Sequence, residues 1–124
     1  MKRTRNARQT VLLACMSLLS LPLSTCGPSL TRAHAESLVD ARHALLEYPE
    51  GEIPASRWPK SVADLEPERV YRRYEGVYII TSEFFVEQRG VFILDTTSSF
   101  VPSRFQDPSY DVVIAGVFIY RSAG

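Results

Sequence analysis

Cysteine and histidine are scarce in this chain, and the few present are poorly placed for most catalytic and metal sites. Both cysteines, Cys15 and Cys26, fall within the first 26 residues, and the only histidines are His34 and His43. A disulfide-stapled fold, a cysteine-based zinc site and a cysteine nucleophile are therefore excluded from the region after Cys26. The motifs of phosphate-binding loops, nucleophile elbows and zinc metalloproteases are also missing. We therefore expect neither an enzyme nor a protein that carries a metal or a cofactor.

Acidic residues are absent from the first 35 positions. This segment carries five basic residues and no acid, whereas residues 36–124 carry nine basic and all 14 acidic residues, a net charge of −5. Charge asymmetry between the two ends is typical of a targeting segment followed by a separate domain. We expect residues 1–35 to be that segment and residues 36–124 to form a single small domain. Because nucleic acids attract basic surfaces, the acidic balance predicts no nucleic-acid partner.

A long hydrophobic run is also missing. The apolar stretch Val11–Leu23 has 13 residues, whereas a membrane-spanning helix needs about 20. Four basic residues precede the stretch, at positions 2, 3, 5 and 8. A basic start followed by a short Leu-rich run is the layout of a secretory signal. The sequence thus predicts an exported protein, periplasmic or extracellular, that touches the membrane only through its N-terminal segment or a lipid anchor.

Three outcomes of processing remain open. The run LSTC that ends at Cys26 resembles a bacterial lipobox, in which the cysteine is lipidated and becomes the first residue, although Thr25 stands where Gly, Ala or Ser is usual. The run AHA that ends at Ala35 matches an A-x-A cleavage site, which would release a soluble chain beginning at Glu36. The segment can also stay uncleaved as an anchor. The candidate processing residues are therefore Cys26 for lipidation and Ala35 for cleavage.

Hydrophobic periodicity predicts a helix followed by strands. Apolar residues recur at three- and four-residue spacing from Ala33 to Glu47, which predicts an amphipathic helix, and Pro59 favours a short second helix that ends at Leu65. Further along the chain the pattern predicts strands at Arg69–Tyr74, Val77–Thr81, Phe84–Glu87 and Val91–Leu94, a long loop at Asp95–Ser109 and a last strand within Val112–Arg121. Hairpin turns are expected at residues 75–76 and 88–90. We expect an α+β fold in which the N-terminal helix packs on an antiparallel β-meander of four to five strands.

A central segment carries a resemblance to known proteins. The run from Ile53 to Ile80, IPASRWPKSVADLEPERVYRRYEGVYII, contains a Trp-Pro pair, a Leu-x-Pro step and a Gly-Val-Tyr-Ile strand. In these motifs it resembles a family of small exported bacterial proteins of unknown function. The resemblance covers under a quarter of the chain. It implies an α+β domain at the cell envelope and implies no activity.

Four residues are candidates for binding contacts. Arg42 falls in the middle of the apolar arc of the first helix, where we expect it to snorkel to the surface along its apolar stem or to form an ion pair with a carboxylate across the helix–sheet boundary. The alternative is that it lines a cleft for an anionic ligand. Trp58 lies in a proline-rich loop and is expected to plug that loop onto the sheet, or else to contact a partner. Phe100 and Phe105, in the long polar loop, are the next contact candidates.

The stretch Arg69–Tyr74 interleaves arginines with aromatic residues. On a strand, Arg69, Tyr71 and Arg73 share one face, because successive side chains alternate. Such a pattern suits single-stranded nucleic acid in principle. In an acidic, exported domain we expect instead an exposed face, or an edge strand that its charges protect from aggregation.

The function that the sequence favours is an envelope-associated binding or structural domain, whose partner is a protein or another envelope component. One alternative is a periplasmic inhibitor or immunity-like protein that blocks an enzyme through its acidic face or its long loop. A further alternative is a small hydrolase built on His43 and the carboxylates on its helix face. A concave pocket around His43 would favour the hydrolase, whereas exposed apolar residues around Trp58, Phe100 and Phe105 would favour binding.

Overall fold

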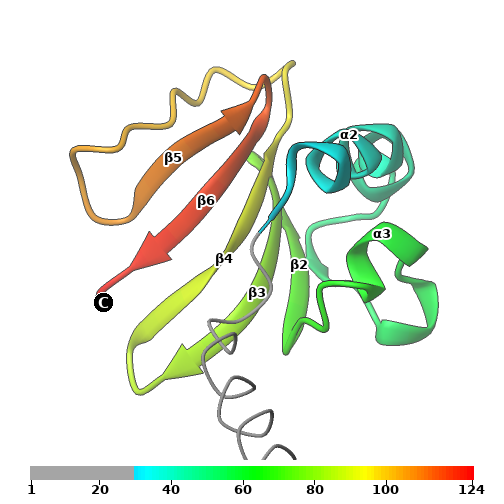
Figure 1. Cartoon of the computed structure of the whole chain (residues 1–124), viewed down its shortest axis with the longest axis horizontal. Coiled ribbons are helices and arrows are strands. Elements are labelled where there is room, and N and C mark those ends of the chain that lie inside the picture. The colour runs from blue at the N-terminus through cyan, green and yellow to red at the C-terminus, as the bar shows by residue number, and fades with distance from the viewer. Residues whose placement is uncertain (1–29) are drawn as a thin grey trace, which may run out of the picture.

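The fold is seen in a computed structural model, which describes residues 30–124. A long helix, α2 (Arg32–Leu46), comes first. The elements that follow are β1 (Gly51–Glu52), the 3-10 helix η2 (Ala55–Arg57), α3 (Lys60–Ala63), β2 (Arg69–Arg73), β3 (Gly76–Phe84), β4 (Glu87–Leu94), β5 (Ser109–Ile114) and β6 (Val117–Ser122). Both helices lie on one side of a twisted sheet (Figure 1). Among the described residues, no helix is long and apolar enough to cross a membrane.

Local sequence explains where α2 begins and ends. Thr31 caps its N-terminus, because the hydroxyl oxygen of Thr31 accepts a hydrogen bond from the backbone N–H of His34 at 3.1 Å. The helix ends at Leu46, shortly before Pro49, since the residue before a proline avoids helical geometry. Leu38 and Leu45 are fully buried on its apolar face. The helix predicted at residues 33–47 is confirmed to within one residue at each end.

The strands form one antiparallel sheet of six strands in the order β1-β2-β3-β4-β6-β5. The predicted α+β architecture, a helix packed on a meander-like antiparallel sheet, is therefore confirmed, with slightly more strands than predicted. Two strands are additional: β1, two residues long, lies within the segment predicted as a loop, and the predicted last strand is divided at Ala115-Gly116 into β5 and β6. One predicted strand is missing, because residues 84–87 form the end of β3, a turn and the start of β4. β6 pairs with β4, so β5 becomes the edge strand.

The two faces of the sheet carry two different cores. Aliphatic side chains face the helices and form one fully buried cluster, whose strand members are Val70, Val77, Ile79, Val91, Ile93 and Val117. Residues of the opposite parity face away from the helices and form a mainly aromatic cluster, which holds Tyr78, Ile80, Phe92, Tyr110 and Tyr120. Strand alternation alone produces this division, because neighbouring residues point to opposite faces.

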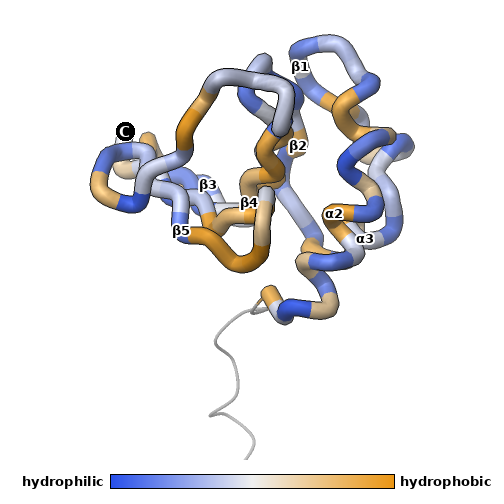
Figure 2. The backbone as a smooth tube through the Cα atoms, turned by 90° about the horizontal axis from the view of Figure 1, so that it is seen from above, coloured by the Kyte–Doolittle hydropathy of each residue, from blue (hydrophilic) through white to orange (hydrophobic). Residues whose placement is uncertain are grey.

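A loop rather than a helix covers the aromatic cluster. Residues 95–108 run back from the end of β4 to the start of β5 on that side, so the sheet lies between the helices and this loop (Figure 2). Phe100 packs from the loop onto Phe92, with the rings edge to face and their centroids 5.9 Å apart. The protein therefore has three layers, of which the outermost on the aromatic side has no regular secondary structure.

The predicted position of the second hairpin turn was wrong. β3 and β4 extend to Phe84 and Glu87, which pair with each other, so the turn consists of Phe85 and Val86 instead of residues 88–90. Gly90 lies in the middle of β4 and is buried. A Cβ atom added there would lie 1.9 Å from the backbone oxygen of Ile79. The glycine therefore serves a close approach of two strands, not a turn.

Candidate functional site

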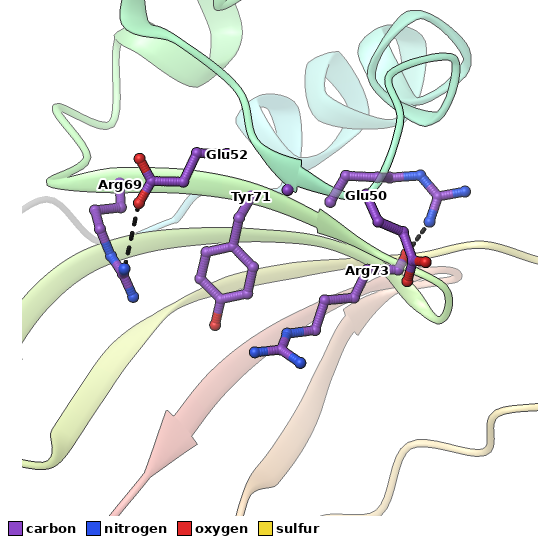
Figure 3. A pocket seen from close by; sticks show the side chains of 7 residues that line it. Glu50, Glu52, Arg69, Tyr71 and Arg73 are labelled. Atoms are coloured by element: carbon purple, nitrogen blue, oxygen red, sulfur yellow. Dashed lines mark hydrogen bonds and ion pairs between the residues drawn. The ribbon is translucent and has the colours of Figure 1, made fainter.

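The candidate site is built on β2, at the end of the sheet where β1 is only two residues long. Alternation along β2 sends Val70 into the aliphatic core and Tyr71 to the opposite face. Arg69 and Arg73 share the face of Tyr71, and Figure 3 shows the three side chains on the same side of the strand, away from the helices. This face, defined by Arg69, Tyr71 and Arg73, is called the arginine–tyrosine face below.

The ring of Tyr71 is held between the two guanidinium groups. The guanidinium carbons of Arg69 and Arg73 lie 5.3 Å and 5.4 Å from its centroid. A cation over an aromatic ring within about 6 Å is attracted by the ring's quadrupole. The ring also stacks on Tyr78, with 5.1 Å between centroids and 18° between planes. Tyr71 therefore couples the two arginines to the aromatic cluster behind them.

The two arginines differ in their ionic partners. Arg69 pairs with Glu52 at 3.3 Å and with Glu83 at 2.9 Å. For Arg73, which is exposed, no carboxylate among residues 30–124 lies within the 4.0 Å that defines an ion pair. The site thus contains one compensated guanidinium and one whose charge is uncompensated within the described part of the chain.

An open hollow of about 470 Å³ lies beside this face. Its lining comes from the loop before β1, from β1 and from β2, and consists of Glu50, Gly51, Glu52, Arg69, Tyr71, Arg72 and Arg73. Three arginines and two glutamates give the lining a net charge of +1, although residues 30–124 together hold ten basic and 14 acidic residues. Arg72 is paired with Asp95, and Arg69 with Glu52 and Glu83. Among the described residues, Arg73 is therefore the cation of this lining that has no carboxylate at ion-pair distance.

Arg72 points to the helix side of the sheet, opposite the arginine–tyrosine face, and holds the backbone of that face in place. Its guanidinium donates to the backbone oxygens of Leu46 and Arg73 and forms an ion pair with Asp95 at 3.2 Å. Only 13% and 14% of these two side chains is exposed. Arg72 thereby ties the end of α2, the end of β2 and the start of the long loop together, and it fixes the backbone that carries Arg73.

The tyrosines of the aromatic cluster stay protonated at neutral pH. Burial raises the pKa of Tyr71 to about 12, and the neighbouring Tyr120 adds to the effect. Burial also raises the pKa of Tyr78, whose hydroxyl shares a hydrogen bond of 2.8 Å with that of Tyr110. The phenol group of Tyr71 therefore acts as a neutral hydrogen-bond donor beside the two cations.

The residues singled out from the sequence do not come together. Trp58 is half-buried against the aliphatic core, and its Nε1 donates to the backbone oxygen of Ile53 at 2.9 Å. Phe100 belongs to the aromatic cluster on the other side of the sheet. Phe105 points into solvent with 87% of its surface exposed, and the guanidinium carbon of Arg104 lies 5.3 Å from its ring centroid.

The ion pair expected for Arg42 is not formed within residues 30–124. Its side chain is half-buried and reaches the turn between β5 and β6, where a Cβ atom on Gly116 would lie 2.9 Å from Nη1. The guanidinium lies against a backbone turn and not against a carboxylate. The arginine is tolerated on the apolar side of α2 because its aliphatic chain covers apolar surface while its guanidinium reaches the turn between β5 and β6.

One of the two processing candidates lies outside the described residues and the other lies within them. Cys26 lies outside the described residues. Ala35 lies in α2 with its side chain fully buried, and Leu30 already packs against the aliphatic core. The folded unit that the structure describes thus includes residues 30–35, which the sequence assigned to the targeting segment.

His43 lies on the exposed face of α2, where its Nε2 is 3.2 Å from a carboxylate oxygen of Glu47. Within residues 30–124, no three His, Cys, Asp or Glu residues are grouped so that they could hold a metal ion. A second open hollow, of about 530 Å³, lies between α2 and α3 and includes His34, whose ring nitrogen is hydrogen-bonded to the backbone oxygen of Ser61 at 2.7 Å. That hydrogen bond joins α2 to α3, so His34 has a structural role between the two helices.

Sequence reasoning missed the exposed apolar turn at Phe85 and Val86, because it placed a strand there and a turn at the next glycine. It identified Arg69, Tyr71 and Arg73 as one face of a strand but assigned them no ligand. Comparisons with protein-family models, with curated proteins and with solved structures find no match for this chain, so the family resemblance of residues 53–80 stays a prediction.

Proposed function

We propose that this protein is a binding domain of the cell envelope, held at the membrane by its N-terminal segment, that recognises an anionic group at the arginine–tyrosine face. The group is a carboxylate or a phosphate carried by an envelope component, since guanidinium forks match these anions best.

Arg73 is the observation that carries the proposal. Its guanidinium is exposed and lies against the ring of Tyr71, with no carboxylate of the described residues within ion-pair distance. Because the side chain already rests on the ring, binding an anion costs less conformational entropy than it would for an extended arginine. The phenol O–H of Tyr71 lies beside it as a further donor, whereas the guanidinium of Arg69 is already bound to Glu52 and Glu83. The hollow has room for the rest of the ligand.

Two features of the N-terminal region support attachment to the envelope. The first 29 residues contain the basic cluster and the apolar run of an export signal. In addition, cleavage after Ala35 would remove the Thr31 cap and a buried residue of α2. Lipidation at Cys26, or retention of the uncleaved segment, would leave α2 whole. The proposal therefore favours a chain that keeps residues 30–35 and remains joined to the membrane.

The test is calorimetric titration of the full chain, in a neutral detergent, with citrate as a carboxylate probe and tripolyphosphate as a phosphate probe. In Arg73→Gln the affinity for the preferred probe should fall about tenfold, because a charge-assisted hydrogen bond is lost from an exposed site. The matched control is Arg57→Gln, which removes an exposed arginine of η2 on the helix side and should leave the affinity unchanged.

The two probes also separate the two chemistries. Tighter binding of tripolyphosphate would assign a phosphate ligand, and tighter binding of citrate a carboxylate ligand. Equal affinities of the wild type and Arg73→Gln for both probes would overturn the proposal. So would an equal loss in Arg57→Gln, since it would show that binding depends only on net charge.

A second candidate function, an inhibitor that acts through its long loop, is favoured by the exposure of Phe105 and of Val101, which is 82% exposed. Aromatic and aliphatic side chains at a loop tip are typical anchors of protein interfaces. Photo-crosslinking in cells distinguishes the two functions. A photoreactive residue at position 105 should yield one defined protein adduct if the protein is an inhibitor, and none if the arginine–tyrosine face alone is used.

A further inference from the structure

The turn between β3 and β4 exposes three consecutive apolar side chains. Phe84, Phe85 and Val86 are 68%, 91% and 67% exposed. The rings of Phe84 and Phe85 contact each other edge to face, with 4.5 Å between centroids. Phe85 has φ = +56°, a conformation in which glycine or asparagine is usual at a hairpin turn and a bulky side chain is strained. We call these three residues the apolar tip.

The apolar tip lies at the end of the molecule where the described chain begins. Leu30 lines an open hollow of about 600 Å³ together with Ser82 and Arg89, which pair with each other across β3 and β4. The turn residues lie three positions beyond that pair, or about 10 Å at the rise of a strand. In Figure 1 the β3–β4 turn is at the bottom of the sheet, below the point at which the described chain begins.

The same end carries two uncompensated arginines. Arg89 of β4 and Arg121 of β6 are direct cross-strand partners, both exposed, and both line the hollow beside Leu30. No carboxylate within residues 30–124 lies at ion-pair distance from either. Two carboxylates lie at the same end, Glu66 in the lining of the hollow and the exposed Glu87 at the start of β4, but neither forms an ion pair with these arginines. The two arginines are therefore available to anionic headgroups while the apolar tip reaches the acyl chains below them.

Chain length limits how far this end can be from the membrane. Leu30 lies four positions after Cys26 and seven positions after Leu23, the last residue of the apolar run. Fully extended, these segments span at most about 14 Å and 25 Å. An anchor at either position therefore keeps Leu30 within reach of the headgroup region, where a tip that projects about 10 Å further meets the acyl boundary.

From this geometry we propose that the apolar tip inserts into the interface of the bilayer that anchors the chain, with Arg89 and Arg121 against anionic headgroups. The contact fixes the orientation of the domain and turns a single tether into two attachment points. One anchored chain end alone leaves a domain free to rotate, whereas two points hold the arginine–tyrosine face in a constant direction. This inference rests on the proposed attachment of the N-terminal segment to the membrane.

The test places a tryptophan on the tip of the full chain, reconstituted into vesicles of phosphatidylcholine and phosphatidylglycerol. The wild type contains only Trp58, which gives the baseline. In Phe85→Trp the added emission should be blue-shifted and quenched when brominated phosphatidylcholine replaces the normal lipid. The matched control is Val112→Trp, whose position on β5 is 67% exposed but distant from the tip, and whose added emission should be neither shifted nor quenched.

Each outcome decides a different point. If the chain floats with the vesicles but the tryptophan at position 85 is not quenched, the tip proposal is wrong while the attachment stands. If the chain does not float, both are wrong. A blue shift at position 85 that depends on protein concentration in detergent without lipid would assign the tip to a second copy of the chain and overturn the membrane contact. Circular dichroism of each variant checks that it is folded.

Discussion

Replacing Phe92 by alanine tests whether the aromatic side of the sheet is a true second core. Phe92 is fully buried in the middle of β4. Its ring centroid lies 4.7 Å from that of Tyr78, 5.0 Å from that of Tyr110 and 5.9 Å from that of Phe100. The substitution therefore removes the ring on which the strands and the covering loop converge.

The expected loss in the free energy of unfolding follows from this packing. A buried Phe→Ala change costs about 3–5 kcal/mol, which includes the lost transfer energy and the cavity. Each aromatic pair contributes about 0.5–1.5 kcal/mol beyond its buried area, and several pairs place Phe92 toward the upper part of that range. Since domains of this size are stable by about 5–15 kcal/mol, the variant loses about a third or more of its stability. Phe105→Ala, at a ring that is 87% exposed, should cost less than about 0.5 kcal/mol.

The assay is urea unfolding of the full chain in a mild detergent, followed by the fluorescence of Trp58. With a slope of about 1–3 kcal/mol per molar urea, the midpoint of Phe92→Ala should fall by at least about 1 M, and that of Phe105→Ala should stay close to the wild type. Equal midpoints for the two variants would refute the reasoning, because they would show that the loop of residues 95–108 does not close a packed layer.

Three further predictions concern charge. Hydrogen bonds from Thr97 lower the pKa of Asp95, so the stability that the carboxylate contributes is present above its unfolded value of 3.8 and is lost as the pH falls through the folded pKa. Urea midpoints at acidic and neutral pH should therefore differ more in the wild type than in Asp95→Asn, and an equal difference would contradict the assignment. Burial raises the pKa of Tyr71 to about 12, so the stability it contributes is complete below an unfolded pKa near 10 and declines as the pH rises toward 12. Burial also raises the pKa values of Tyr78, Tyr110 and Tyr120. Absorbance at about 295 nm and circular dichroism should then show the tyrosines of the aromatic cluster ionising together with alkaline unfolding, whereas full ionisation of a folded chain near pH 10 would contradict it. Finally, Arg42→Met should change the free energy of unfolding by less than about 1 kcal/mol, because no carboxylate of the described residues pairs with Arg42. A loss of several kcal/mol in thermal or urea unfolding would mean that the arginine has an ionic role.

The parts of the fold that the sequence predicted correctly are those that neighbouring residues determine. The spacing of Leu38 and Leu45 defines the buried face of α2. The first hairpin turn, predicted at residues 75–76, lies one residue earlier, at Tyr74-Glu75, and follows from a local break between two β-rich runs. Gly90 shows the limit of this reasoning. Because Gly90 stands between polar and apolar residues, the sequence predicted a turn there. Its role is instead to let the backbone of Ile79 on β3 lie close to β4. That contact exists only once the two strands are paired.

The candidate site was less predictable, because partners from distant parts of the chain decide it. Phe100 and Phe105 lie five residues apart in one polar loop, yet one packs on Phe92 and the other is exposed. Arg69 and Arg73 are equivalent by strand alternation, but only Arg69 has carboxylates beside it, supplied by β1 and by the far end of β3. No local pattern separates the members of either pair.

The loop that covers the aromatic cluster also contacts an edge of the sheet. The backbone oxygen of Ser103 accepts a hydrogen bond from the N–H of Tyr110 at 2.9 Å, on β5, while at the opposite edge of the sheet β1 offers only two residues. The loop thus occupies the start of the edge strand β5, where a strand of another molecule would otherwise pair. A cut within residues 95–108 would expose an open strand and a hydrophobic face at once, so its first consequence would be edge-to-edge aggregation.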